Sequence, residues 1–509
     1  MTFEIVFVLL SLLGMMAALI ADKMRPGMVL FSVVVLFLCV GILTPKEMLE
    51  GFSNKGMITV ALLFLVSEGI RQSGTLGQVI KKLLPQGKTT VFKAQLRILP
   101  SVAFISAFLN NTPVVVIFAP IIKHWAKSVK LPATKFLIPL SYVTILGGIC
   151  TLIGTSTNLV VHGMILEAGY EGFTMFELGK VGIFIAIAGI IYLFIFSKRL
   201  LPDARPDTAV PDEEVEEGEK LHRVEAVLGA RFPGINKKLS DFNFQRHYGA
   251  EVKEIKTRNG QRYVNHLEDV VLREGDTLVV MADDTFIPTW GESSVFVLLT
   301  NGNDPDTSGK KKRWLALILL VLMIVGATVG ELPATKEMFP DIKLDMFFFV
   351  CITTIIMAWT NIFPARKYTK YISWDILITI ACAFAISKAM VNSGVADCVA
   401  GFIIGLSDDY GPHVLLAILF VITNLFTELI TNNAAAALAF PLALSISAQL
   451  GVSPTPFFVV ICMAASASFS TPIGYQTNLI VQGIGNYKFT DFVRIGLPLN
   501  IITFLISVI

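Results

Sequence analysis

Apolar segments that are long enough, or nearly long enough, to cross a membrane recur along the whole chain. They occupy about residues 3–20, 27–44, 57–70, 136–166, 180–200, 314–330, 344–363, 372–392, 455–484 and 491–509. A helix needs about 20 apolar residues to cross about 30 Å of hydrocarbon. The pattern therefore predicts a polytopic α-helical membrane protein.

Two further apolar stretches, about 90–127 and 413–448, are interrupted near their centres by adjacent asparagines. These are Asn110 and Asn111 in the first stretch, and Asn432 and Asn433 in the second. Basic residues mark the cytoplasmic ends of membrane spans, and they flank the first stretch on both sides. We therefore expect the first stretch to be a re-entrant hairpin that opens to the cytoplasm, and the second to be a hairpin that opens to the outside.

The two ends of the chain contain matching motifs at a nearly constant distance. Residues 109–113 align with 430–434, 154–161 with 474–481, and 72–74 with 392–394, at offsets of 321, 320 and 320. Each half has five spans and one hairpin, and because five is odd the second half starts on the opposite side. The sequence thus predicts two inverted transmembrane repeats, 1–201 and 314–509, an arrangement typical of secondary transporters.

Four polar breaks fall at repeated positions within the apolar pattern. They are residues 110–112, 154–158, 431–433 and 474–478. Backbone released from a helix inside a membrane must be satisfied by protein, water or ligand. Amide, hydroxyl and carbonyl oxygens are hard ligands suited to Na⁺, and the N-termini of the half-helices that follow would attract an anion. The alternative, that these side chains only cap kinked helices, explains neither the repetition nor the paired amides.

Some ionisable residues of the spans need a separate interpretation, because a charge in a span is a functional hypothesis by default. Glu68 and Lys388 occupy equivalent positions of the two halves near span ends, where they can reach the membrane surface. Glu428 lies next to the predicted second cation site and either tunes it or makes a structural hydrogen bond. For His162, helix packing is favoured over proton transfer.

Charged residues make up only 16% of the chain, and 37 of the 80 lie within residues 202–313. This distribution excludes an ordinary soluble enzyme and a disordered chain, and it indicates one soluble insert. The net charge of +2, without a basic stripe, indicates no nucleic-acid partner. The six cysteines lie in or beside apolar segments and form no metal-binding or disulfide pattern. No catalytic motif stands out, so we expect no enzymatic activity.

The insert begins with an acidic, proline-containing linker at 202–220. Residues 221–286 are predicted to form a small α/β domain with strands at 224–230 and 277–280 and a hairpin at 250–264 that turns at Asn259-Gly260. We interpret residues 287–313 as a tether to the second repeat. The orientation of the spans places the insert in the cytoplasm, and we expect the chain to lie in the cell (inner) membrane.

The phrases "AFLNNTPVV", "ITNNAAAALAFP" and "TPIGYQTNL" resemble the divalent anion/sodium symporter family, in particular its sulfate-permease-like members. The hallmark of that family is a Ser-Asn-Thr triplet at each hairpin tip, which here reads Asn110-Asn111-Thr112 and Thr431-Asn432-Asn433. The resemblance implies a homodimer with a scaffold and an elevator-like transport domain in each protomer, embedded in membrane lipid. It also implies coupling to Na⁺ and transport of a divalent anion.

The resemblance and the polar breaks together name the expected site residues. The Na⁺ ligands would come from Ser106, Asn110, Asn111, Gly154, Asn158, Thr427, Thr431, Asn432, Gly474, Gln476 and Asn478. The anion would contact Asn111, Thr112, Thr155, Ser156, Asn432, Asn433 and Thr477. Asn433 replaces a family threonine, which favours a small oxyanion such as sulfate over a dicarboxylate, the alternative substrate.

The insert, with "HYGAEVKEIKTRNG" and "LREGDTLVVMAD", resembles a TrkA-C domain, the regulatory module of potassium channels and some transporters. Such domains pair about a two-fold axis and bind small ligands, among them cyclic dinucleotides. This resemblance leaves open a passive dimerisation domain. It also raises a more distant alternative, a TrkA-C-gated potassium channel or transport subunit. Potassium filters need four Thr-Val-Gly-Tyr-Gly-like loops, whereas the breaks contain one Gly-Tyr, at Gly474-Tyr475.

Overall fold

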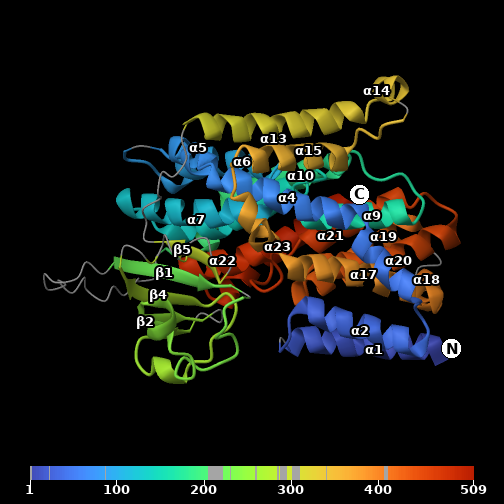
Figure 1. The fold of residues 1–509 in the computed structure, drawn as a ribbon, viewed down its shortest axis with the longest axis horizontal. Helices are drawn as coiled ribbons and strands as arrows, with labels where there is room; N and C mark the ends of the chain where they lie inside the picture. The colour runs from blue at the N-terminus through green and yellow to red at the C-terminus, as the bar shows by residue number, and fades with distance from the viewer. Residues whose placement is uncertain are drawn as a thin grey trace, which may run out of the picture.

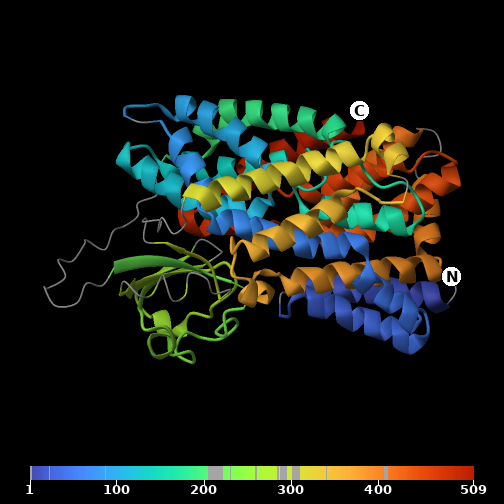
Figure 2. The same ribbon diagram turned by 45° about the horizontal axis from the view of Figure 1, so that its top comes forward.

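A computed structural model describes residues 3–21, 23–85, 87–203, 222–229, 231–257, 261–283, 286, 290, 295–300, 310–339, 341–405 and 411–509. Most of these residues are helical, and the helices form one elongated body with a small sheet at one end (Figures 1 and 2). Eight helices in the described ranges are long and apolar enough to cross a membrane. The predicted polytopic helical protein is therefore confirmed.

The part of the chain before the insert folds into ten α-helices in the described residues. They are α1 Phe3–Ala21, α2 Pro26–Val40, α3 Pro45–Glu50, α4 Lys55–Gln72, α5 Thr75–Leu83, α6 Val91–Ser106, α7 Asn111–Ser128, α8 Leu137–Gly148, α9 Ser156–Glu167 and α10 Gly179–Leu200. The first interrupted stretch becomes α6 and α7, which meet at the Asn110-Asn111 break. The apolar run 136–166 is likewise divided into α8 and α9, because residues 149–155 are not helical.

The part after the insert contains α13 Lys310–Gly330, α14 Pro333–Met338, α15 Met346–Trp359, α16 Tyr368–Tyr371, α17 Trp374–Asn392, α18 Val395–Gly405, α19 Pro412–Leu429, α20 Asn432–Leu450, α21 Thr455–Ser466, α22 Gln476–Gly485 and α23 Phe489–Val508. The second interrupted stretch becomes α19 and α20, and the apolar run 455–484 becomes α21 and α22. Helices α5 and α18 were not predicted. Both follow a Ser-Gly turn in which the glycine, Gly74 or Gly394, has a positive φ.

The insert forms a five-stranded sheet in the order β3-β2-β4-β1-β5. Its elements are β1 His222–Leu228, α11 Phe244–Tyr248, β2 Glu251–Lys256, β3 Arg262–Tyr263, β4 Thr277–Ala282 and β5 Phe296–Thr300. Strand β1 pairs antiparallel with β4 and with β5. The predicted tether at 287–313 is thus wrong in part, because β5 pairs with the sheet. Most of the 202–220 linker and the Asn259-Gly260 turn lie outside the described residues.

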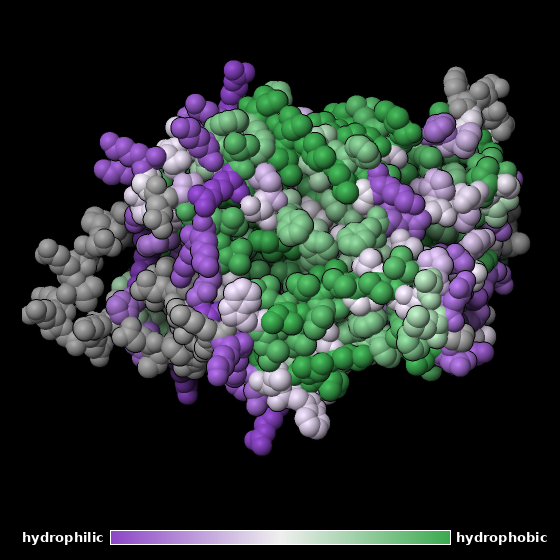
Figure 3. Space-filling model, turned by 90° about the horizontal axis from the view of Figure 1, so that it is seen from above, coloured by the Kyte–Doolittle hydropathy of each residue, from purple (hydrophilic) through white to green (hydrophobic). Residues whose placement is uncertain are grey.

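On the face seen in Figure 3, a broad apolar band covers the helical body between two more hydrophilic ends. Large hydrophobic side chains are exposed along its outer helices, among them Leu10 on α1, Phe184 on α10 and Ile318 on α13. Exposed apolar surface of this extent is costly in water but stable against hydrocarbon. The band therefore indicates the surface that faces lipid in this multi-pass membrane protein.

Candidate functional site

The two hairpins end in the same local structure. At the first break, Ser106 Oγ lies 2.8 Å from the amide of Asn111, the first residue of α7. At the second, Thr427 Oγ1 donates to Asn432 Oδ1 at 2.8 Å, and Asn432 is the first residue of α20. Asn111 is fully buried and Asn432 is 9% exposed. A hydroxyl and an amide are therefore brought together in each half at an offset of 321 residues.

The other two breaks also share their hydrogen bonds. Asn158 Nδ2 donates to Thr151 O at 2.9 Å and to Gly148 O at 3.4 Å. Asn478 Nδ2 donates to Ser468 O at 2.8 Å and to Thr471 O at 3.1 Å. Each acceptor in the second half lies 320 residues after its counterpart. These two asparagines satisfy carbonyl groups that the interrupted helices leave free.

Glycine is required where the broken segments approach each other most closely. A Cβ on Gly154 would lie 2.4 Å from Gly148 O, and a Cβ on Gly474 would lie 2.5 Å from Thr427 O. Real Cβ atoms essentially never come this close to another heavy atom. At both predicted positions, Gly154 and Gly474, the backbone approaches a neighbouring carbonyl oxygen too closely for any side chain.

Four half-helices begin at the four breaks. Their N-cap residues are Asn110 for α7, Thr155 for α9, Thr431 for α20 and Tyr475 for α22, and none makes a side-chain capping bond. The first backbone N–H groups of a helix have no partner within the helix and carry partial positive charge. The four breaks thus supply donors for an anion without any lysine or arginine in the motifs.

Polar side chains also pair across the two halves. Thr112 Oγ1 donates to Gln476 Oε1 at 3.2 Å, and Ser156 Oγ donates to Asn433 Oδ1 at 3.2 Å. Thr112 corresponds to Asn433 at an offset of 321, and Ser156 corresponds to Gln476 at 320. Each bond therefore joins the same two positions of the repeat. In one bond the hairpin residue comes from the first half, and in the other it comes from the second half.

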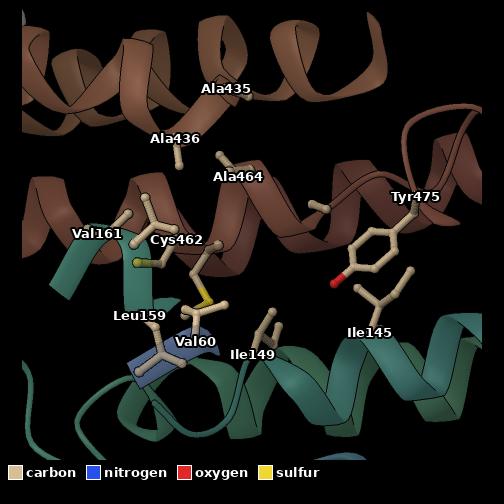
Figure 4. Close-up of a cluster of buried hydrophobic side chains, with 14 of the residues drawn as sticks. Val60, Ile145, Ile149, Leu159, Val161, Ala435, Ala436, Cys462, Ala464 and Tyr475 are labelled. Carbon is tan, nitrogen blue, oxygen red and sulfur yellow. The ribbon is translucent and has the colours of Figure 1, made fainter. Parts of the chain in front are cut away.

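Tyr475, which directly precedes Gln476, was not among the predicted site residues. Tyr475 OH donates to Asn111 Oδ1 at 2.5 Å when the Asn111 amide is oriented to satisfy both of its groups. In that orientation the amide nitrogen donates to Thr144 O at 3.0 Å. The same hydroxyl lies 3.1 Å from Thr155 Oγ1. The tyrosine ring projects from its loop toward Ile145 of α8 (Figure 4).

Two other predicted residues have different surroundings. Thr477 Oγ1 accepts from Ser141 Oγ of α8 at 2.9 Å, away from the pairs that cross between the halves. Thr431 Oγ1 is buried without a hydrogen-bond partner, which leaves it free to serve as an oxygen ligand. The described residues contain no group of three His, Cys, Asp or Glu that could hold a metal ion. The oxygen donors here are hydroxyls, amides and carbonyls, which fit an alkali cation better than a transition metal.

Glu428 is an acidic side chain beside the second hairpin tip, where the sequence predicts a cation site. Its Oε1 accepts from Ser470 N at 2.9 Å and from Asn500 Nδ2 at 2.8 Å, and its Oε2 lies 3.4 Å from Ser468 Oγ. The equivalent position in the first half is Ala107. Glu68, by contrast, pairs with Arg71 at 2.6 Å. The carboxylate of Glu428 thus makes the two halves electrostatically unequal.

A small cavity lies beside one face of this site. Its volume of about 10 Å³ is enough for about one water molecule, and it is lined by Asn110 and Ser156 together with side chains of α4 and α13, including Ser67 and Leu320. It lies between the first hairpin tip and the start of α9.

The insert contacts the far ends of the site helices. Lys123 of α7 pairs with Glu225 of β1, with its Nζ 3.0 Å from both carboxylate oxygens. Lys256 Nζ of β2 lies 3.3 Å from Glu225 Oε1. Burial alone would raise the pKa of Glu225, but these two ammonium groups outweigh it and lower the pKa to about 2. Gly483 of α22 packs directly against Thr277 of β4.

A family model described as a citrate transporter matches residues 16–445 and 342–509 of the chain. An uncharacterized transporter of Synechocystis is 29% identical over 92% of this chain and 90% of its own length. Sodium/sulfate cotransporter 2 of Chlamydomonas reinhardtii is 30% identical over 55% of this chain and 31% of its own length. A sodium-dependent dicarboxylate transporter of Staphylococcus saprophyticus is 25% identical over 28% of this chain. With matches that span nearly all of its length, the chain belongs to the citrate transporter family.

Proposed function

We propose that this protein is a secondary active transporter that carries a divalent oxyanion, with sulfate favoured, together with Na⁺. A dicarboxylate is the alternative substrate. The names of the sodium/sulfate and sodium-dependent dicarboxylate relatives support both the ion coupling and the class of substrate. The replacement of a family threonine by Asn433 favours the smaller anion.

One observation carries this proposal: four uncapped half-helices begin at four breaks that contain neutral oxygen and nitrogen groups. Helix N-termini attract a dianion, but partial charges alone compensate it incompletely in a medium of low dielectric. Na⁺ ions at the two hydroxyl–amide pairs, Ser106 with Asn111 and Thr427 with Asn432, would supply the remaining charge. Each ion would then strengthen the binding of the other, which favours transport of the two together.

The exchanged pairs support two inverted repeats. When two copies are related by a two-fold axis, residue i of one copy contacts residue j of the other, and the reverse contact also occurs. The bonds from Thr112 to Gln476 and from Ser156 to Asn433 have this relation. An elevator-type movement would then carry the four half-helices as one unit past a scaffold that forms the homodimer.

The contacts of the insert support a regulatory role. It holds α7 through Lys123 and Glu225, and it contacts α22 through Gly483 and Thr277. It also reaches the segment before α17, because an Arg231 side-chain nitrogen donates to Ile372 O at 3.2 Å. We infer that the insert restrains the site helices relative to α17, and that a small ligand such as a cyclic dinucleotide changes this restraint. The pairing with Lys123, a basic residue of the membrane part, favours a cytoplasmic insert and an inner-membrane location.

The test is uptake of radiolabelled sulfate into proteoliposomes with and without an inward Na⁺ gradient. We expect uptake that depends on the gradient and is reduced by unlabelled sulfate more than by succinate or citrate. Uptake that ignores the gradient would refute sodium coupling. Stronger competition by succinate or citrate than by sulfate would refute the choice of substrate.

A further inference from the structure

Tyr475 is the single aromatic residue in the four breaks. Its counterpart in the first half, 320 residues earlier, is Thr155, and each of the two residues is the N-cap of its half-helix. Tyr475 is 8% exposed and Thr155 is 2% exposed. Within the breaks, the two halves therefore differ strongly in side-chain size at a position where both residues are buried.

Tyr475 and Thr155 occupy the same position of the two repeats, and they also contact each other. Residues that are counterparts of each other can touch only near the axis that relates the two copies. The 3.1 Å contact between Tyr475 OH and Thr155 Oγ1 therefore lies near this axis. The exchanged bonds of Thr112 with Gln476 and of Ser156 with Asn433 are related by the same axis.

The phenol group differs from its surroundings in two ways. It can donate one hydrogen bond and accept others, and it donates to the Asn111 amide here. Its rigid ring also fills space that a threonine at the same position would leave open. Burial of such a ring removes on the order of 150–250 Å² of its surface from contact with solvent.

We propose that Tyr475 determines which anion the site accepts. Its hydroxyl turns from Asn111 to donate to a bound oxyanion, and its ring occupies the space that the second carboxylate of a dicarboxylate would need. The proposal rests on the proposed function, because it assigns a selective role within the same anion site. A small tetrahedral dianion is thereby favoured over an elongated one.

The expected effect of removing the Tyr475 hydroxyl follows from the free energy of a hydrogen bond to a charged group. Removal of one such bond weakens binding by roughly tenfold or more. Tyr475→Phe keeps the ring and removes only the donor, so it separates the two effects. Tyr475→Thr introduces the residue of the other half and removes the ring, so it opens the space.

The experiment measures sulfate and succinate uptake for the wild type, Tyr475→Phe and Tyr475→Thr in the same proteoliposomes. We expect the half-saturating sulfate concentration of Tyr475→Phe to rise about tenfold, with little change in the maximal rate. We expect Tyr475→Thr to shift the ratio of succinate to sulfate uptake by about tenfold or more toward succinate. Tyr192→Phe is the matched control, since Tyr192 is also buried and its hydroxyl donates to Ile495 O at 3.0 Å.

Unchanged half-saturation in Tyr475→Phe, or the same substrate ratio in Tyr475→Thr as in Tyr192→Phe, would overturn this assignment. Monodisperse elution of each variant shows that it is folded. A wild type that carries neither anion would refute the proposed function itself. A wild type that carries sulfate while the variants keep its ratio would refute the role of Tyr475 alone.

Discussion

The ion pair between the insert and α7 allows a quantitative test of how firmly the sheet is held. The perturbation is Glu225→Gln, which removes a charge but keeps the size of the side chain. Glu225 is only 14% exposed, and it faces Lys123 at 3.0 Å and Lys256 at 3.3 Å. The substitution therefore leaves two partly buried ammonium groups without their common partner.

The magnitude follows from the pKa of Glu225. That pKa falls from an ordinary 4.5 to about 2, and each unit corresponds to about 1.4 kcal/mol. The charged form is thus stabilised by about 3 kcal/mol in the folded state, within the range for breaking a buried ion pair. Because the folded pKa is below the unfolded one, this stabilisation is present above about pH 4.5 and is lost as the pH falls toward 2.

The assay is hydrogen–deuterium exchange of the backbone amides of β1. At neutral pH, Glu225→Gln should speed the exchange of the slowest amides by on the order of 100-fold. The control is Asp269→Asn, which removes a similar charge from the exposed pair with Lys238 and should change exchange little. Wild-type protection should decline between about pH 4.5 and 2, whereas the Glu225→Gln variant should lack this decline. Equal exchange in Glu225→Gln and Asp269→Asn would show that the Glu225 ion pairs do not hold β1 in place.

Three further predictions concern the site and its link to the insert. Asn111→Ala and Asn432→Ala should each abolish sodium-dependent uptake in protein that elutes as a folded species, because each removes an amide that pairs with a hydroxyl at a break; normal uptake in both would rule out these sites. Glu428→Gln should raise the half-saturating Na⁺ concentration roughly tenfold by removing a nearby negative charge, and an unchanged value would assign the side chain to hydrogen bonding alone. Gly483→Ala should displace the insert, because the new Cβ would lie 2.4 Å from Thr277 Oγ1, and it should expose the sheet to protease; adding Thr277→Ala should restore protection, and failure of this rescue would contradict the contact.

The sequence predicts the breaks because polar residues are conspicuous in apolar segments. Asn111, Asn158, Asn432 and Asn478 could be selected for this reason, and the structure places each at the start of a half-helix or within its first turn. The internal repeat also predicts which asparagines correspond, because residues at the same offset are expected to have the same local structure. The hydrogen bonds at the breaks then follow from the need to satisfy free carbonyl groups.

Other features could not be predicted, for physical reasons. Tyr475 is itself mostly apolar and follows a glycine, so it is not conspicuous in a hydrophobic pattern, and only its alignment with Thr155 could have identified it. Strand β5 is short and follows a polar segment, and it is stabilised by pairing with β1, a distant partner that local pattern does not reveal. The contact between Lys123 and Glu225 joins residues 102 positions apart. Neither charge pattern nor periodicity specifies such a pair.

In the proposed function, the anion and Na⁺ cross the membrane together. The most direct measurement imposes an inward sulfate gradient on proteoliposomes that have equal Na⁺ concentrations on both sides, and follows radioactive sodium. Coupled transport predicts that sodium accumulates against its own concentration, and that Asn111→Ala and Asn432→Ala vesicles show none of this accumulation. Sulfate entry without any sodium accumulation above that of empty vesicles would contradict the claim.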